Sequence, residues 1–155
     1  MVSPIFVKRE VKMYKCKFLI TQVVDDKTKA PTHFGIFSIL KIKDTGDVLV
    51  DKWKALSGGW GKGPLEEGDY TCYPVKPLPN DKAHAAFSSE GSSWVMSLFP
   101  LFKTSRFDLA VHPDGNLPGT LGCIGILNRT KDCFDELKEC QPGKLLVIKR
   151  IINEN

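Results

Sequence analysis

The chain places one imidazole and one thiol in a context that suits nucleophilic catalysis. A short apolar stretch ends in His112, a turn rich in glycine and proline follows, and Cys123 comes eleven positions after the histidine. A thiol attacks as the thiolate, so it needs a nearby base. We therefore expect the two residues to lie at the mouths of neighbouring strands as base and nucleophile. The alternatives are a buried structural cysteine and a strand-end histidine satisfied by backbone groups.

Neighbouring residues are candidates for substrate binding and orientation. Gly122 lets the backbone approach a substrate closely, and amides near Gly122 and Cys123 would then face a developing oxyanion. Asp114 is either a turn former or the group that orients His112. Arg106, ahead of the histidine, is either a fork for a substrate carboxylate or a solvated arginine.

A glycine-rich loop over residues 57–64 carries Trp60, which we regard as a candidate substrate-facing ring. The loop lacks the Gly-Lys-Ser/Thr ending of a phosphate-binding loop, and no helix pattern follows it. Nucleotide binding is therefore not expected.

Composition narrows the class of protein. The 155 residues suit one domain with a real core. The formal charge of +4 is mild and comes without a basic run, so nucleic acid is not an expected partner. No apolar stretch reaches the roughly 20 residues of a membrane span. The first residues lack the apolar region of a secretory signal, so we expect synthesis in a cytoplasm.

The cysteines and histidines do not suggest a metal. Five cysteines form no C-x-x-C pair, and three histidines follow no ligand spacing, so neither a metal nor another cofactor is expected. Without a secretion signal, we expect all five cysteines to be reduced thiols.

Strand patterns dominate the chain, with one credible helix. Asp132 is the expected helix cap, and Pro142-Gly143 the stop. We predict a mostly β domain of eight or nine strands and one short helix, and a surface loop over residues 77–91. The predicted strands are 14–24, 34–42, 48–56 after a turn at 44–47, 69–75, 93–99, 106–112 and 144–152.

Three motifs together resemble a known family. They are His112 followed by Thr120-Leu121-Gly122-Cys123-Ile124, the segment from Ser57-Gly58-Gly59 to Gly68-Asp69-Tyr70, and a short helix followed by Gly143-Lys144-Leu145-Leu146-Val147-Ile148. Their order and spacing, from about residue 34 to 152, resemble the catalytic domain of the L,D-transpeptidases, the YkuD-type cysteine enzymes of peptidoglycan. The resemblance implies a β-sandwich or partly open barrel, one domain over residues 1–155 with about 13 residues as an N-terminal extension, and a monomer.

The resemblance also implies an activity. Cys123 would attack the carbonyl of the L-centre residue next to a terminal D-amino acid of a stem peptide, with His112 as base and then acid. Water or an amine would resolve the thioester, giving L,D-carboxypeptidase or L,D-transpeptidase activity. In this reading Arg106, Thr120, Trp60 and Asp114 bind substrate. Loop 57–68 or loop 77–91 would cover Cys123, with Trp60 or Trp94 near the opening.

Two positions depart from the family pattern. Leu121 stands where the family has a histidine, and Gly125 stands where it usually has an arginine. This variant pattern is similar to phage-borne or secreted-toxin relatives, which would meet the periplasmic or external wall after lysis or non-classical export. Hydrolysis, exchange, a different small peptide as substrate, and a non-catalytic module that binds cell wall or a partner all stay open.

Overall fold

The computed structural model describes residues 12–25, 30–115, 120 and 122–151. Strands make up 50% of it, alongside one short α-helix, which confirms the mostly β prediction. Most of the expected N-terminal extension lies outside the described residues. The elements are β1 (Tyr14–Val24), β2 (Thr32–Lys41), β3 (Val48–Gly58), β4 (Gly68–Cys72), β5 (Lys76–Pro77), the 3-10 helix η1 (Lys82–Phe87), β6 (Ser88–Ser89), β7 (Ser92–Pro100), β8 (Leu109–Pro113), β9 (Ile124–Ile126), α1 (Thr130–Cys140) and β10 (Lys144–Lys149).

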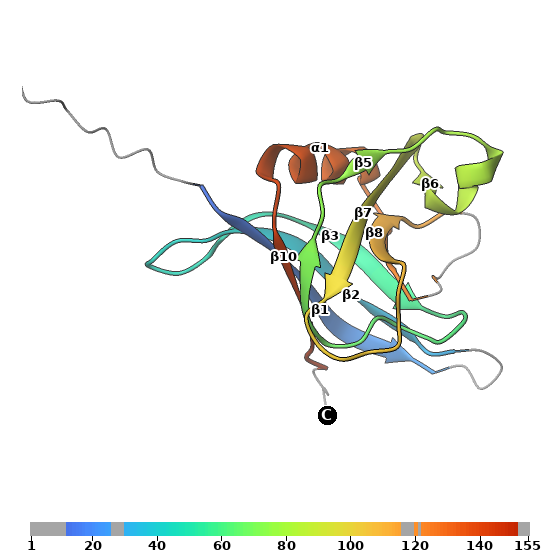
Figure 1. Ribbon diagram of the computed structural model, residues 1–155, viewed down its shortest axis with the longest axis horizontal. Coiled ribbons are helices and arrows are strands. Elements are labelled where there is room, and N and C mark those ends of the chain that lie inside the picture. The colour runs from blue at the N-terminus through green and yellow to red at the C-terminus, as the bar shows by residue number, and fades with distance from the viewer. Residues whose placement is uncertain (1–11, 26–29, 116–119, 121, 152–155) are drawn as a thin grey trace, which may run out of the picture.

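Eight of these strands close into a barrel (Figure 1). The order around it is β4-β10-β1-β2-β3-β9-β8-β7, and β7 pairs back onto β4 through Tyr70–Pro100 and Cys72–Leu98. The pairs β1–β10 and β8–β9 are parallel, and the other neighbours are antiparallel. A sandwich or partly open barrel was expected from sequence. The β4–β7 pairing closes the sheet and leaves no open edge between those two strands.

Alternation along the strands fills the barrel with apolar side chains. Phe18 and Ile20 of β1 face inward with Val147 of β10, and all three are buried. Each such side chain contributes roughly 1.5–3 kcal/mol of burial free energy. The helix α1 lies across one end of the barrel beside β5 and β7 (Figure 1). There Trp94 is 0% exposed, and its indole N–H donates to the Thr130 carbonyl at 2.9 Å.

The helix begins three residues earlier than predicted. Asp132, expected as the cap, lies within the first turn of α1, and the N-cap position is Arg129 in a left-handed conformation with no side-chain capping bond. Asp132 contacts the Arg129 guanidinium at 3.3 Å instead. The cap prediction was therefore wrong, although a carboxylate in the first turn still interacts favourably with the helix dipole.

Strand β8 begins at Leu109, three residues later than predicted. Asp108 has a φ of 55°, a left-handed value that a strand does not accommodate. The segment 106–108 therefore forms a turn that leads into β8. In the part of the chain that the structure describes, no helix is long and apolar enough to cross a membrane.

Candidate active site

The strand that carries His112, β8, continues one residue further to Pro113, and it lies beside β9, the strand that directly follows Cys123; this adjacency was predicted. β8 and β9 pair in parallel with Val111 opposite Ile124 and His112 opposite Gly125. Val111 and Ile124 belong to the core cluster, so His112, the residue after Val111 on β8, lies on the opposite face of that strand. Cys123 directly precedes β9, so it lies next to the start of the strand that pairs with β8. Residues 116–119 of the intervening loop lie outside the described part.

The imidazole of His112 is held in one orientation. It is 4% exposed, its Nδ1 donates to the Pro113 carbonyl at 2.7 Å, and the Phe87 ring meets it edge to face at 4.4 Å. Because a carbonyl only accepts, Nδ1 carries the proton and Nε2 carries the lone pair. Burial lowers the pKa of His112 to about 4, against the opposing effect of the Pro113 carbonyl. At neutral pH the ring is therefore neutral, with its lone pair on Nε2.

The Pro113 carbonyl orients His112. Asp114 was expected either as a turn former or as the group that orients His112, and this orienting role stays a prediction. Its backbone N–H donates to the Ile126 carbonyl at 2.9 Å. Its side chain lies over Gly125, where an added Cβ would come within 2.8 Å of Asp114 Cβ. Asp114 thus occupies the space of a side chain at position 125, and its role in substrate binding stays a prediction.

The Cys123 thiol is half-buried next to the start of β8. Its Sγ lies 3.8 Å from the Asp108 carbonyl. Burial raises the thiol pKa, the Ala110 amide acts in the opposite direction, and the Asp108 carboxylate raises it further. No hydrogen bond joins Sγ to the imidazole among the contacts of these two described residues. The resting pair is therefore a neutral thiol beside a neutral imidazole.

Two buried hydroxyls fix the backbone of Cys123. Ser57 Oγ and Thr120 Oγ1 both donate to the Cys123 carbonyl, at 2.7 and 2.5 Å. Ser57 Oγ also accepts from the Leu65 amide at 2.8 Å, and Thr120 Oγ1 accepts from the Gly58 amide at 3.0 Å. Thr120 was expected to bind substrate. Its hydroxyl is buried and bonded on several sides, and one of those bonds holds the Cys123 backbone; its role in substrate binding stays a prediction.

Gly122 holds a conformation that other residues rarely adopt. Its φ is 127°, and a Cβ there would lie 3.4 Å from Arg106 Nη1. The Gly122 amide is directed at Thr120 Oγ1 at 3.4 Å, a long contact, rather than at a clear site for an oxyanion. Its role in an oxyanion hole stays a prediction.

Arg106 is bound to the glycine-rich loop. Its guanidinium donates to the carbonyls of Lys62, Gly63 and Pro64, and its Nε lies 3.8 Å from a Glu66 carboxylate oxygen. Most of its donors thus hold the loop against Gly122. The fork for a substrate carboxylate stays a prediction, and it would compete with these loop contacts.

The two tryptophans expected near the opening of the site differ in their exposure to solvent. Trp94 belongs to the core beneath α1, so it is not a ring at the site opening. Trp60 is 37% exposed in the turn closed by the bond from the Gly63 amide to its carbonyl. Loop 77–91 covers His112 through Phe87, and the Gly115 amide bonds to the Ala86 carbonyl at 3.3 Å.

Ser57, Phe87 and Asp108 make contacts at the site that no sequence pattern predicted. Ser57 stands at the start of the glycine-rich loop named above. Its small polar side chain at the end of an apolar strand could have indicated a buried hydrogen bond. Nothing local marks Phe87 or Asp108, because their contacts come from segments 25 and 15 positions away in sequence.

Removing the Ser57 hydroxyl should destabilise the fold and the site together. Ser57→Ala leaves the buried Leu65 amide without its acceptor, so we expect a loss of about 1–3 kcal/mol in unfolding free energy, measured by urea denaturation. Ser38→Ala is the control, since Ser38 Oγ makes only a 3.5 Å contact to the Lys17 carbonyl. Equal losses in the two variants would contradict the role assigned to Ser57.

Acid should destabilise the protein through His112. The unfolded histidine has a pKa near 6.5 and the folded one near 4, so the unfolded state binds more protons between these values. Stability is therefore full above pH 6.5 and falls as the pH approaches 4, by about 3 kcal/mol in all. Urea unfolding at pH 7 and pH 4.5 measures this. His112→Asn should flatten most of the dependence, and the rest includes His33, whose pKa burial also lowers.

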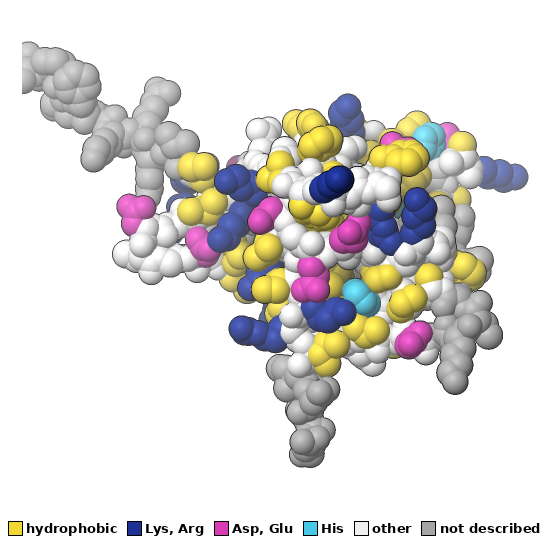
Figure 2. Space-filling model, turned by 60° about the horizontal axis from the view of Figure 1, so that its bottom comes forward, with side chains coloured by type: hydrophobic (Ala, Val, Ile, Leu, Met, Phe, Trp, Pro, Cys, Tyr) yellow, Lys and Arg dark blue, Asp and Glu magenta, His cyan; other side chains and the backbone are white. Residues whose placement is uncertain are grey.

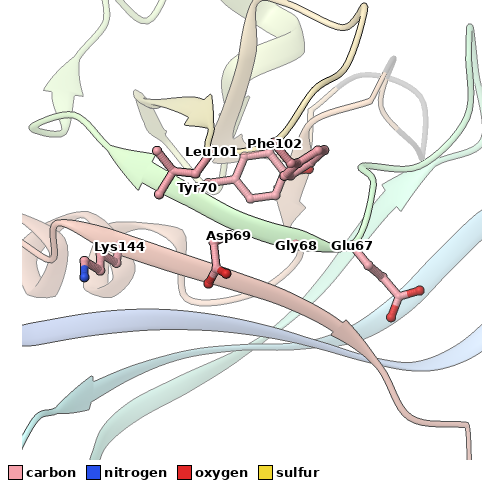
Figure 3. Close-up of a pocket in the computed structure, with 7 residues that line it drawn as sticks. All are labelled: Glu67, Gly68, Asp69, Tyr70, Leu101, Phe102 and Lys144. Carbon is pink, nitrogen blue, oxygen red and sulfur yellow. The ribbon is translucent and has the colours of Figure 1, made fainter.

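One hollow among the described residues lies away from the pair. Figure 3 shows it over β4 and β10, lined by Tyr70, Leu101, Phe102 and Lys144 among others, with a volume of about 590 Å³. It contains neither Cys123 nor His112. The described residues include no group of three or more His, Cys, Asp or Glu side chains placed to hold a metal ion.

The chain was also compared with known proteins. No family model matches it, and no curated protein sequence matches it.

Proposed function

We propose that the protein is a cysteine-dependent enzyme of L,D-transpeptidase type, acting by acyl transfer or hydrolysis on peptidoglycan stem peptides. The observation that carries the proposal is the parallel pairing of β8 with β9, which sets His112 on the strand beside the one that Cys123 directly precedes, with Nδ1 of the imidazole anchored on the Pro113 carbonyl. Nucleophile, base and a group that orients the base are the parts that covalent acyl transfer needs.

The neutral resting pair sets the order of events. Nε2 of His112 takes the Sγ proton as the sulfur attacks the carbonyl of the L-centre residue, since no ion pair exists beforehand. The imidazolium then gives that proton to the leaving amine, the terminal D-amino acid. The resulting thioester is resolved by water, with His112 as base again, or by an amine from a second peptide.

The test is incubation of the purified protein with muropeptides, followed by mass spectrometry. Loss of a terminal D-alanine indicates hydrolysis, replacement by an added D-amino acid indicates exchange, and a cross-linked product indicates transpeptidation. No change in any muropeptide over a day at micromolar enzyme would argue against the proposal.

A second candidate is a non-catalytic module that binds cell wall or a partner. It is favoured by the half-buried thiol with a raised pKa and by the lack of a bond between Sγ and the imidazole. Sedimentation with purified wall material, unaffected by Cys123→Ala and without any muropeptide turnover, would support it.

The charge distribution on the face drawn in Figure 2 does not distinguish the two candidate functions. On that face, basic side chains are dispersed among acidic and hydrophobic ones rather than gathered in one continuous patch. The absence of nucleic acid among the partners stays a prediction, as does the cell-wall location.

A further inference from the structure

An aromatic side chain next to the nucleophile is unusually exposed. Phe107 is 77% exposed, more than any other large apolar side chain that the structure describes. So little burial contributes little to the stability of the fold. A ring left in water immediately before the turn at Asp108 is therefore a candidate for contact with a ligand.

The backbone on both sides of Phe107 is fixed relative to the site. On one side, Arg106 is bonded to the carbonyls of the glycine-rich loop. On the other, Asp108 has a φ of 55°, and its carbonyl contacts Sγ of Cys123. Strain of this kind persists where the surroundings impose it and is common at functional sites. The backbone at Phe107 is thus fixed one residue before the carbonyl that contacts the thiol.

A cavity of about 240 Å³ opens at this place, lined by Gly61, Lys62, Arg106, Phe107 and Leu109. It borders the residue before the nucleophile: a Cβ added at Gly122 would lie 3.4 Å from Arg106 Nη1 and 4.0 Å from Leu109 Cδ2. The volume is below that of a drug-sized pocket and suits one amino-acid side chain.

The lining has two chemical parts. Phe107 and Leu109 give an apolar wall, and the ionisable groups that line the cavity, Lys62 and Arg106, are both cationic. Arg106 is largely committed to loop carbonyls and Glu66, so the exposed Lys62 ammonium supplies the positive charge toward solvent. A ligand that matches both parts carries a methylene chain ending in an anion.

We propose that this cavity binds an acidic side chain of the donor peptide, with its methylenes against Phe107 and its carboxylate at Lys62. The inference rests on the proposed function, and it makes Lys62 and Phe107 residues that determine specificity. Side-chain binding here places the peptide's reacting carbonyl beside Cys123 and contributes through orientation.

The test uses two synthetic stem peptides that differ only in one acidic side chain, free in the first and amidated in the second. We expect the wild-type protein to prefer the free acid at least tenfold in kcat/KM. Lys62→Gln should reduce that ratio to near one. Phe107→Ala should raise KM about tenfold for the free acid. The matched controls are Lys103→Gln and Phe99→Ala, which remove an exposed lysine and a 56% exposed aromatic away from the cavity and should leave the ratio and KM unchanged.

Both peptides are also titrated onto full-length Cys123→Ser protein by calorimetry. Turnover without a preference for the acid overturns the cavity assignment and leaves the proposed function standing. Preferential binding of the acid, lost in Lys62→Gln, without any turnover supports the cavity and overturns the enzyme. Equal binding of both peptides, or an equal effect of Lys62→Gln and Lys103→Gln, overturns the assignment.

Discussion

Replacing Cys123 by alanine should abolish turnover of muropeptides while leaving the fold intact. We expect a loss of at least about 10⁴-fold in kcat, since the covalent route needs the sulfur itself. The melting temperature should change by no more than a few degrees, because Sγ is half-buried and its contact to the Asp108 carbonyl is a long 3.8 Å. Mass spectrometry of the products and differential scanning calorimetry measure the two effects.

The other cysteines provide the control. Cys16, Cys72, Cys133 and Cys140 all lie in the buried core cluster, so none is placed to meet a peptide. Cys140→Ser is the mildest of these changes, since Cys140 is at the end of α1 and its Sγ contacts Glu136 at 3.8 Å. It should retain wild-type kcat. Comparable turnover in Cys123→Ala and Cys140→Ser would rule out covalent catalysis by Cys123.

Local sequence patterns predict the strands well and the ends of elements less well. The strand over residues 14–24 has the predicted bounds, because apolar residues alternate cleanly along it. The strand expected from residue 106 begins at Leu109, because Asp108 takes a left-handed conformation. The residue type alone did not predict that conformation. Barrel closure was not predicted, since the β4–β7 pairing joins residues about 30 positions apart and has no local signature.

The candidate site also has one part that the sequence predicts and another that only the fold brings together. Residue types and spacing identified His112 and Cys123, and the parallel pairing of β8 and β9 places them as neighbours. The contacts that hold them come from distant segments: Ser57 reaches Cys123 across 66 positions, and Phe87 reaches His112 across 25. Only the folded barrel brings such groups together.

One departure from the family pattern has a steric reason in this chain. Gly125 stands where the resembling family usually has an arginine, and the Asp114 side chain fills the space that any side chain at 125 would need. Position 125 therefore supplies no cation beside Cys123. Arg106, packed against Gly122, and Lys62, in the adjoining loop, are the cations that the structure places there.

Replacing His112 by asparagine should separate catalysis from structure. Asparagine keeps an N–H donor near the position of Nδ1, so the bond to the Pro113 carbonyl can persist, but it removes the basic Nε2. We expect kcat to fall about 10²- to 10⁴-fold, the usual contribution of a general base. Circular dichroism at pH 7 should show a folded protein.

The reactivity of the thiol without substrate distinguishes a general base from a preformed ion pair. Burial holds the His112 ring neutral and raises the pKa of Cys123, so alkylation by iodoacetamide should be slow at pH 7 and should accelerate as the pH rises above 9. His112→Asn should then change the alkylation rate at pH 7 little, despite its large effect on kcat. Rapid alkylation of the wild-type protein at pH 6 that is lost in His112→Asn would instead demonstrate a resting thiolate–imidazolium pair, and the proton transfer would then precede the attack on the peptide.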